Sequence, residues 1–215
     1  MRYLPLDLDV QGREALFLGG SAELVSKIDR LLDAGAIVTV IAEGPLDAAI
    51  EERAARGVIT LLRRAFTFAD LERKAIVFQA PFTTPEDEAL ARRLDAHARA
   101  HGLLFCAVDR PEACTFINSA VVQASGLTMT FNTGGTSPGT ARRIREDLER
   151  LFGDPRFARY LDLLRALRAS LPRGERAARL AEAVKGFAVE ARLVFPAWFE
   201  AGDAPPPASK PAGDP

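Results

Sequence analysis

Short apolar runs alternate with amphipathic helical patterns over the first half of this chain. Residues 37–41 (Ile-Val-Thr-Val-Ile) are mostly β-branched with little polar alternation, as in a strand buried on both faces. Just before them, residues 22–34 carry Leu24, Ile28 and Leu31 at helical spacing. The same reasoning predicts strands at 14–18, 58–62, 75–79 and 103–108, helices at 46–56 and 85–101, and a short helical turn at 68–72. Strands that alternate with helices predict an α/β fold with a parallel, doubly wound, Rossmann-like sheet.

The pattern changes after residue 109. Three short strands are expected at 114–117, 120–124 and 127–132, followed by helices at 138–152, 156–169 and 175–194. The last stretch is rich in Pro, Ala and Gly, and we expect it to be disordered. The sequence therefore predicts a Rossmann-like domain over 1–112, a small strand-containing region over 113–150, a helical C-terminal domain over 151–200 and a disordered tail over 201–215.

Composition narrows the choice of partners. The 28 Lys and Arg residues nearly balance the 29 Asp and Glu residues, so nucleic acid and membranes are not expected partners. The chain has no run of eighteen apolar residues, and polar residues interrupt its first nine positions. We therefore expect neither a membrane span nor a signal peptide, and a cytoplasmic location.

The cysteines and histidines do not have the spacing of a metal site. Cys106 and Cys114 lack the close spacing of zinc motifs, and we expect both to be reduced, buried and apolar in role. His97 and His101 lie four residues apart on a predicted helix among several arginines. A solvated helix face explains them better than a metal site does.

The first strand leads into a glycine turn, Gly19-Gly20-Ser21-Ala22-Glu23-Leu24. Dinucleotide-binding turns carry the motif G-x-G-x-x-G. In this chain Ser21 stands at the second glycine position of the motif and Leu24 at the third. Glu23 adds a negative charge that favours the bare helix and opposes an anionic ligand. Glu43, just past the second strand, lies where a ribose hydroxyl is commonly bound. A dinucleotide site and a plain strand–turn–helix both fit; the candidate cofactor contacts are Gly19, Gly20, Ser21, Ala22 and Glu43.

A second glycine turn, Phe131-Asn-Thr-Gly-Gly-Thr-Ser-Pro138, also leads into a helix. Ser137 is a candidate N-cap, and Pro138 suits the first helical position. The exposed N–H groups and the helix dipole suit phosphate or carboxylate groups. Nearby hydroxyls and cations are those of Thr133, Thr136, Ser137, Arg142 and Arg143. A well-capped strand–turn–helix connection without a ligand remains the alternative.

Asp109 ends the last predicted strand of the parallel sheet. Ligands of open α/β sheets bind at this carboxyl edge, where a carboxylate can act as a general base or contact a metal. The alternative is a turn aspartate before Arg110-Pro111.

Together, these motifs resemble those of the precorrin-2 dehydrogenase/sirohydrochlorin ferrochelatase family, which also forms the N-terminal module of siroheme synthases. The specific parts are Val108-Asp-Arg-Pro111 and Thr133-Gly-Gly-Thr-Ser-Pro138. The opening Arg2-Tyr-Leu-Pro-Leu6 and the segment 31–40 also match, and the resemblance covers roughly residues 2–195.

The resemblance implies a homodimer with an NAD-binding domain over 1–112 and a dimerisation and tetrapyrrole-binding region over 113–150. It implies NAD-dependent oxidation of precorrin-2 to sirohydrochlorin and, in many members, insertion of Fe²⁺. The essential aspartate of the family falls on Asp109, which would move a proton or escort the metal ion. A position at which some members carry a phosphorylatable serine falls on Thr133. The implied substrate contacts are Thr133, Gly134, Gly135, Thr136, Ser137, Asn118 and Arg142, and Ala80 joins the cofactor contacts.

The chain also departs from the family pattern, mostly on the cofactor side. Besides Ser21 and Leu24, Ala80-Pro-Phe-Thr83 replaces the usual Ala-Thr-Asp/Asn, Cys106 replaces an Asn, and Asn118-Ser-Ala120 replaces Phe-x-Pro. Three hypotheses follow. The chain is an NAD-dependent precorrin-2 dehydrogenase with or without chelatase activity, an NAD-independent chelatase, or a non-catalytic tetrapyrrole-binding or regulatory protein. NAD⁺ binding separates the first from the others, and metal insertion dependent on Asp109 separates the second from the third.

Overall fold

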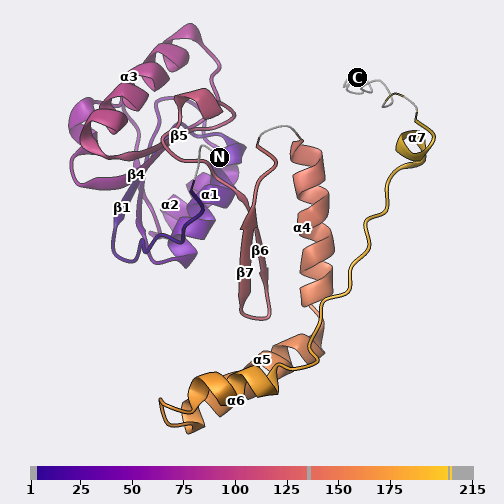
Figure 1. Cartoon of the computed structure of the whole chain (residues 1–215). Helices are drawn as coiled ribbons and strands as arrows, with labels where there is room; N and C mark the ends of the chain where they lie inside the picture. Colours follow the sequence, from indigo (N-terminus) through magenta and orange to yellow (C-terminus); the bar gives the residue numbers. More distant parts are fainter. Residues whose placement is uncertain (1–3, 135–136, 203, 205–215) are drawn as a thin grey trace. The chain divides into compact units, whose positions relative to one another are not determined.

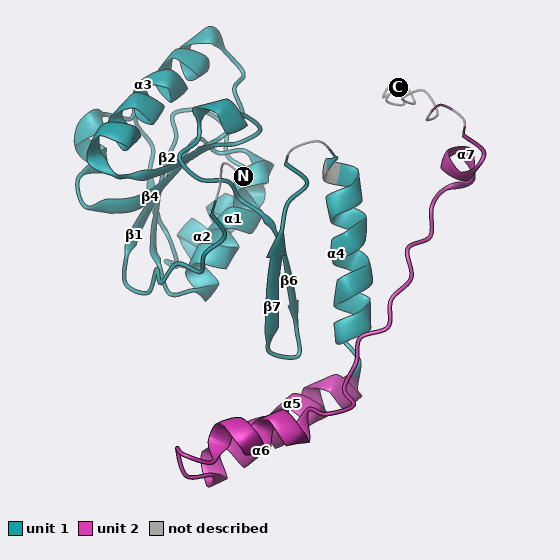
Figure 2. Ribbon diagram, viewed as in Figure 1, with its two compact units in different colours: residues 1–154 teal, residues 155–215 magenta. Residues whose placement is uncertain are grey.

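The computed structural model describes residues 4–134, 137–202 and 204. The chain forms two compact units, residues 1–154 and residues 155–215 (Figure 2). The candidate site residues all belong to the first unit.

The first unit is built on a five-stranded parallel sheet with the strand order β3-β2-β1-β4-β5 (Figure 1). Its elements are β1 (Glu14–Leu18), α1 (Ala22–Asp33), β2 (Ile37–Ile41), α2 (Ala48–Ala55), β3 (Thr60–Leu62), the 3-10 turn η1 (Phe68–Leu71), β4 (Lys74–Gln79), α3 (Pro85–His101), β5 (Leu104–Ala107) and the 3-10 turn η2 (Pro111–Ala113). The order reverses between β1 and β4, which creates the switch point where open α/β sheets bind ligands. The predicted α/β, Rossmann-like fold is confirmed.

Helices cover both faces of this sheet. Helices α1 and α2 lie on one face, where Arg53 of α2 forms an ion pair with Asp29 of α1 at 2.6 Å, and α3 lies on the other (Figure 1). The central strands are buried on both faces, and Leu16, Phe17 and Val77 are all fully buried. This burial explains why their sequences show apolar runs without alternation.

An antiparallel hairpin and one helix complete the first unit. Strands β6 (Ala120–Ala124) and β7 (Leu127–Phe131) pair, and α4 (Pro138–Phe152) packs against β6. The Ser125 hydroxyl at the hairpin turn donates to the Phe152 carbonyl at 3.0 Å, which ties the turn to the end of α4.

The predicted strand at 114–117 is wrong. Only Cys114 pairs with the sheet, through a single antiparallel bridge to Cys106. The Thr115 hydroxyl accepts a hydrogen bond from Phe105 N at 2.8 Å and donates to Leu103 O at 3.1 Å. This side chain therefore takes the place of part of the backbone ladder that a strand would form.

The second unit is helical, with α5 (Pro155–Ser170), α6 (Arg176–Ala183) and the short α7 (Ala197–Glu200). The helix predicted at 175–194 is too long, because α6 ends before Gly186, which adopts a φ of 84°. Residues 187–196 continue without regular structure. Residues 203 and 205–215 of the expected tail lie outside the described residues.

Candidate functional site

Three backbone hydrogen bonds align the carboxyl ends of four neighbouring strands. Just beyond the strand ends, Gly19 N donates to Ile41 O at 2.8 Å, Ala80 N to Leu18 O at 2.8 Å, and Val108 N to Gln79 O at 3.0 Å. These bonds extend the ladder by one step at each strand end. They bring the glycine turn, Ala80 and the residue before Asp109 to one edge of the sheet.

Both glycines of the first turn have a steric reason in the structure. Gly19 adopts a φ of 101°, and an added Cβ would lie 2.6 Å from the Ala80 Cβ. A Cβ on Gly20 would lie 2.4 Å from Leu46 Cδ2 and 2.7 Å from the Pro45 carbonyl oxygen. Gly20 is therefore explained by the loop before α2, and its being glycine is not by itself evidence for a ligand.

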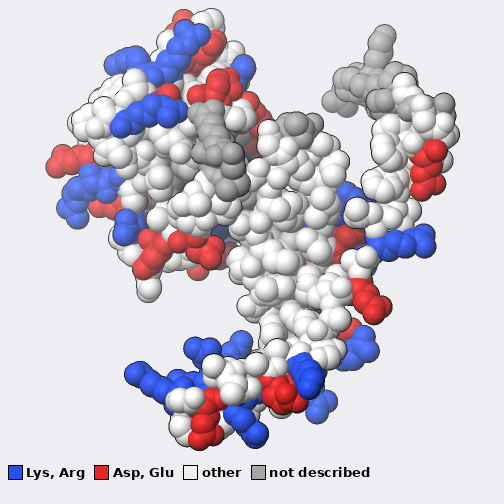
Figure 3. All heavy atoms as spheres, in the orientation of Figure 1, with Lys and Arg blue, Asp and Glu red and all other residues white. Residues whose placement is uncertain are grey.

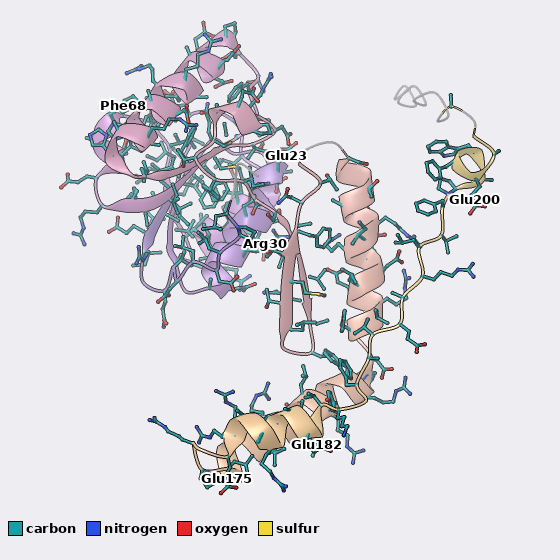
Figure 4. All side chains as sticks on the ribbon, viewed as in Figure 1. Glu23, Arg30, Phe68, Glu175, Glu182 and Glu200 are labelled. Carbon is teal, nitrogen blue, oxygen red and sulfur yellow. The ribbon has the colours of Figure 1, made fainter. Side chains whose placement is uncertain are left out.

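A carboxylate lies at the start of α1. Glu23 stands in the first turn of this helix, and Arg30 lies two turns further along (Figure 4). The backbone N–H of Glu23 itself, and next the Ser21 hydroxyl, hold the pKa of Glu23 below its usual range. Ser21 Oγ is buried and makes no well-formed hydrogen bond, although it lies near this carboxylate. The Glu23 carboxylate therefore interacts with the N-terminus of its own helix.

Asp109 occupies a tight, exposed turn after β5. Its φ is 62°, a left-handed conformation that Asp adopts more readily than most residues. Arg110 N donates to Ala107 O at 3.2 Å and closes the turn. Lys27 of α1 lies close enough for Asp109 to affect it: burial lowers the pKa of Lys27, and the nearby Cys106 and Asp109 groups oppose that shift. The Lys27 ammonium also donates to Glu23 O at 2.7 Å, one turn back along the same helix.

Two thiols lie beneath the Asp109 turn. Cys106 and Cys114 are both free and buried, as predicted. The neighbouring Cys114 thiol and burial raise the pKa of Cys106, and the charge of Lys27 and the backbone N–H of Asn118 partly offset this. Asn118, a predicted substrate contact, is thus adjacent to the same strand end, and its residue is exposed.

Further predicted contacts form a second group where β7 leads into α4. Ser137 N donates to the Thr133 hydroxyl at 3.3 Å, and this hydroxyl donates to Ser137 O, also at 3.3 Å. Gly134 N donates to the Asn132 side chain at 3.1 Å. Ser137 caps α4 by accepting from Thr140 N at 3.3 Å, so the predicted cap is confirmed. Gly135 and Thr136 lie outside the described residues.

The arginines of α4 are paired along the helix. Arg142 contacts Glu146 at 2.9 Å, and Arg143 contacts Asp147 at 3.1 Å. Both arginine side chains are largely exposed, at 76% and 67%. Exposed pairs of this kind contribute about 0.3–0.5 kcal/mol each, so a ligand carboxylate could replace Glu146 at little cost.

Other features of the described residues lie away from this edge. A cavity of about 510 Å³ is found at the amino edge of the sheet, lined in part by Phe68, His97 and His101. Within the described ranges, no group of three or more His, Cys, Asp and Glu side chains could hold a metal ion. No helix in the described part of the chain is long and apolar enough to cross a membrane.

Sequence reasoning missed Lys27 and the pairing of Cys106 with Cys114. Lys27 occupies a polar position in the helical pattern at 22–34, one turn after Glu23, and its sequence context carries no further signal. The thiols were assigned separately, because their pairing depends on the bridge between residues that are eight positions apart.

Comparison with known proteins gives the class of this fold. The sequence model of a family described as putative NAD(P)-binding matches residues 6–120. This match covers more than half of the chain, which therefore belongs to that family.

The individual relatives narrow the class. The chain is 38% identical over 149 residues to siroheme synthase of Methylococcus capsulatus, covering 69% of this chain and 30% of the relative. It is 32% identical over 173 residues to siroheme synthase of Azotobacter vinelandii, covering 80% of this chain and 36% of the relative. The chain thus spans about a third of the length of the curated relatives it matches. These matches confirm the predicted resemblance to the precorrin-2 dehydrogenase/siroheme synthase family.

A solved structure supports the same architecture. SirC, described as a precorrin-2 dehydrogenase, matches with a TM-score of 0.68 and 22% sequence identity, covering 86% of this chain and 90% of that chain. At this identity the likeness establishes the fold.

Proposed function

We propose that this chain oxidises precorrin-2 to sirohydrochlorin with NAD⁺ as the oxidant. The observation that carries the proposal is the line of hydrogen bonds from Gly19, Ala80 and Val108, which gathers the glycine turn and Asp109 at one sheet edge. A dinucleotide and a catalytic carboxylate would need to share such an edge.

The residues at the switch point fit a dinucleotide, with one group opposed to it. Gly19 provides the tight turn that brings the start of α1 over the ends of β1 and β4. Ser21 and Ala22 would face the pyrophosphate, and the exposed Glu43 would accept from a ribose hydroxyl. The Glu23 carboxylate opposes the pyrophosphate charge and weakens this site. When bound, NAD⁺ supplies a hydride acceptor.

Asp109 would take the proton that leaves the substrate as the hydride is removed. The residue is exposed at the end of β5, so a bulky substrate can reach its carboxylate. The turn closed by Arg110 N holds the residue in one backbone conformation. Such positioning is what a general base needs, and general acid–base catalysis contributes about 10²–10⁴-fold to rate.

The start of α4 would receive carboxylates of the tetrapyrrole. Gly134, Thr133 and Ser137 would exchange their internal hydrogen bonds for substrate carboxylates next to a helix N-terminus, and Arg142 would exchange Glu146 in the same way. Because the N–H and hydroxyl groups of Gly134, Thr133 and Ser137 are neutral, they suit several weakly held carboxylates better than one tightly held anion.

We also propose that two copies of the chain pair through the β6–β7 hairpin and α4. Ile144 and Leu151 of α4 are 38% and 40% exposed although they lie on one side of the helix, seven residues apart. Figure 3 shows few charged side chains over the visible part of β6, β7 and α4, whereas charges of both signs cover the sheet domain. A surface with few charges and exposed apolar side chains are both features that suit contact with a second copy.

The test is the effect of Asp109→Asn on the anaerobic conversion of precorrin-2 to sirohydrochlorin, followed by absorbance with saturating NAD⁺. We expect turnover to fall by about 10²–10⁴-fold with folding intact. Glu112→Gln is the matched control, because Glu112 is an exposed carboxylate on the same loop. Unchanged turnover in Asp109→Asn would contradict the assignment of Asp109.

The same preparations separate the alternatives. Asp109 is exposed and could also release a metal ion to the product, so Fe²⁺ insertion into sirohydrochlorin is measured without NAD⁺. Metal insertion without NAD⁺-dependent oxidation would favour the chelatase hypothesis. Tetrapyrrole binding with neither activity would favour a carrier or regulatory protein.

A further inference from the structure

We propose that Cys106 and Cys114 are a redox modification site, oxidised to one intrachain disulfide that locks the Asp109 turn. The effect on turnover rests on the proposed role of Asp109, whereas disulfide formation does not.

The backbone sets the two cysteines directly opposite each other. They form an antiparallel bridge, and the adjacent bond from Thr115 N to Phe105 O, at 2.9 Å, lies on one side of the pair. This arrangement makes them a non-hydrogen-bonded pair, in which Cα atoms are typically about 4.5 Å apart and the side chains approach closely. Disulfides need Cα separations of roughly 4.4–6.8 Å, so the backbone is already in range.

The two sulfur atoms also meet the same acceptor. Cys106 Sγ lies 3.9 Å and Cys114 Sγ lies 3.3 Å from the Ala107 carbonyl oxygen. The two thiols are thus on the same side of the bridge, close enough for each to alter the acidity of the other. A rotation of side chains, without movement of a strand, would bring the sulfur atoms into bonding distance.

The reduced thiol of Cys114 supports the turn that carries Asp109. It donates towards the carbonyls of Ala107 and Arg110, at 3.3 and 3.1 Å, and these residues flank the left-handed Asp109. A disulfide removes this S–H donor from both carbonyls. The turn then relaxes to a different conformation, which the disulfide holds in place, and the Asp109 carboxylate moves with it.

The chemistry needs an oxidant, and we take it to be a small disulfide such as oxidised glutathione. One cysteine thiolate attacks it, forms a mixed disulfide and releases one glutathione thiol. The second cysteine then attacks the protein sulfur of the mixed disulfide and releases the second glutathione. The protein loses two hydrogens in total, and these reduce one glutathione disulfide to two thiols.

Burial makes the reaction slow and selective. Cys106 and Cys114 are 6% and 2% exposed, whereas Asp109 and Arg110 above them are exposed. Local opening of the 107–113 loop would therefore expose the thiols to a small oxidant while the sheet stays folded.

The experiment equilibrates the full chain in glutathione buffers of rising oxidised fraction and then alkylates it in denaturant. We expect two alkylated thiols in reducing buffer, none in oxidising buffer, and a Cys106–Cys114 peptide cross-link. Reduced and oxidised samples are then assayed for turnover, which should fall about tenfold on oxidation because the carboxylate is displaced. In Cys106→Ser, which keeps Cys114 and its hydrogen bonds, the ratio of the two rates should stay near one.

Two results would overturn the proposal. Thiols that stay alkylatable in excess oxidised glutathione, or that link only between chains, would contradict the modification site. A cross-link that leaves turnover unchanged would contradict its control of Asp109.

If the reduced protein shows no turnover at all, the proposed function fails but the modification is still tested. Hydrogen exchange of the 107–113 amides then replaces turnover as the readout. Exchange that differs between reduced and oxidised protein is expected, and identical exchange would overturn the locking of the turn.

Discussion

Helices α1 and α4 both follow a glycine-containing turn, yet their first turns differ in charge and in capping. Helix α1 begins with Glu23 in its first turn, whereas α4 begins with Pro138, Gly139 and Thr140 and has no acidic residue there. Ser137 caps α4 through its hydroxyl, whereas Ser21, within the described contacts, does not cap α1. A glycine-containing turn before a helix can therefore favour or oppose anion binding. The presence or absence of a carboxylate such as Glu23 in the first helical turn determines which of the two occurs.

This difference in charge leads us to expect different affinities at the proposed tetrapyrrole site of α4 and the proposed NAD⁺ site of α1. Under the proposed function, carboxylates of the substrate would meet the positive end of the α4 dipole, and the nearby arginines would add to the attraction. At α1 the Glu23 carboxylate already lies at the positive end of the helix. We expect the tetrapyrrole to be held more strongly than NAD⁺.

Among the changes that test this comparison of α1 with α4, the largest effect should come from placing a first-turn carboxylate, as in α1, on α4. Thr140→Glu places a carboxylate in the first turn of α4 and creates a Ser137-x-x-Glu capping box. We expect tetrapyrrole affinity to fall about tenfold through repulsion, while thermal stability is unchanged or higher. Fluorescence titration and thermal unfolding measure the two. Thr140→Gln is the control, since it keeps the box without the charge; equal losses in both variants would show that charge is not the cause.

Replacing Ser137 or Ser21 by alanine should show how much each serine stabilises the start of its helix. Ser137→Ala removes the hydrogen bond from Thr140 N and should cost about 1 kcal/mol of unfolding free energy. Ser21→Ala should cost much less, because no capping bond is lost at α1. Urea unfolding compares them, and a larger cost for Ser21→Ala would reverse the comparison.

Removing the negative charge of Glu23 from the start of α1 should strengthen NAD⁺ binding. Glu23→Gln is expected to tighten NAD⁺ binding by about two- to fivefold, because a charge near a helix end is worth about 0.3–1 kcal/mol. Calorimetric titration measures this, and Glu43→Gln should instead weaken binding. Equal or weaker binding in Glu23→Gln would show that this carboxylate does not oppose the cofactor.

The same carboxylate gives a pH dependence of stability. The folded protein lowers the pKa of Glu23, so its stabilising effect is present above the ordinary glutamate pKa of about 4.3 and is lost as pH falls. The stability difference between wild type and Glu23→Gln should therefore shrink below about pH 4. A difference that grows on acidification would contradict the lowered pKa.

The smallest effect should come from Arg142→Ala. The variant breaks an exposed pair with Glu146, so stability should change by only about 0.3–0.5 kcal/mol. The KM for the tetrapyrrole should rise two- to threefold, since one exposed carboxylate contact is lost. Arg143→Ala, which breaks the equivalent pair with Asp147, is the matched control. Equal KM changes in both would indicate a general charge effect.

Much of this fold could be predicted because its signals are local. The β-branched run at 37–41 and the periodic apolar positions of α1 identify their elements without tertiary information. The errors arose where a side chain or a single backbone angle decided the outcome. Thr115 replaces a backbone ladder with its hydroxyl, and Gly186 adopts a left-handed conformation soon after α6 ends.

The site was predictable in part for the same reason. Asp109 and the first glycine turn follow strands of the parallel sheet, so their place at its edge comes from topology. Position 20 requires glycine because a Cβ there would clash with the Leu46 side chain. Cys106 and Cys114 are paired by an isolated antiparallel β-bridge. Neither depends on sequence spacing alone.

The three bonds from Gly19, Ala80 and Val108 also bear on how this protein could change over time. Each of them fixes the last backbone position before a loop that carries a candidate functional residue. The loops beyond these positions can gain, lose or exchange residues while their points of attachment stay in register. Substitutions such as Ser21 and Pro81 can therefore accumulate in one loop at a time, so that affinity for one ligand changes without loss of the others.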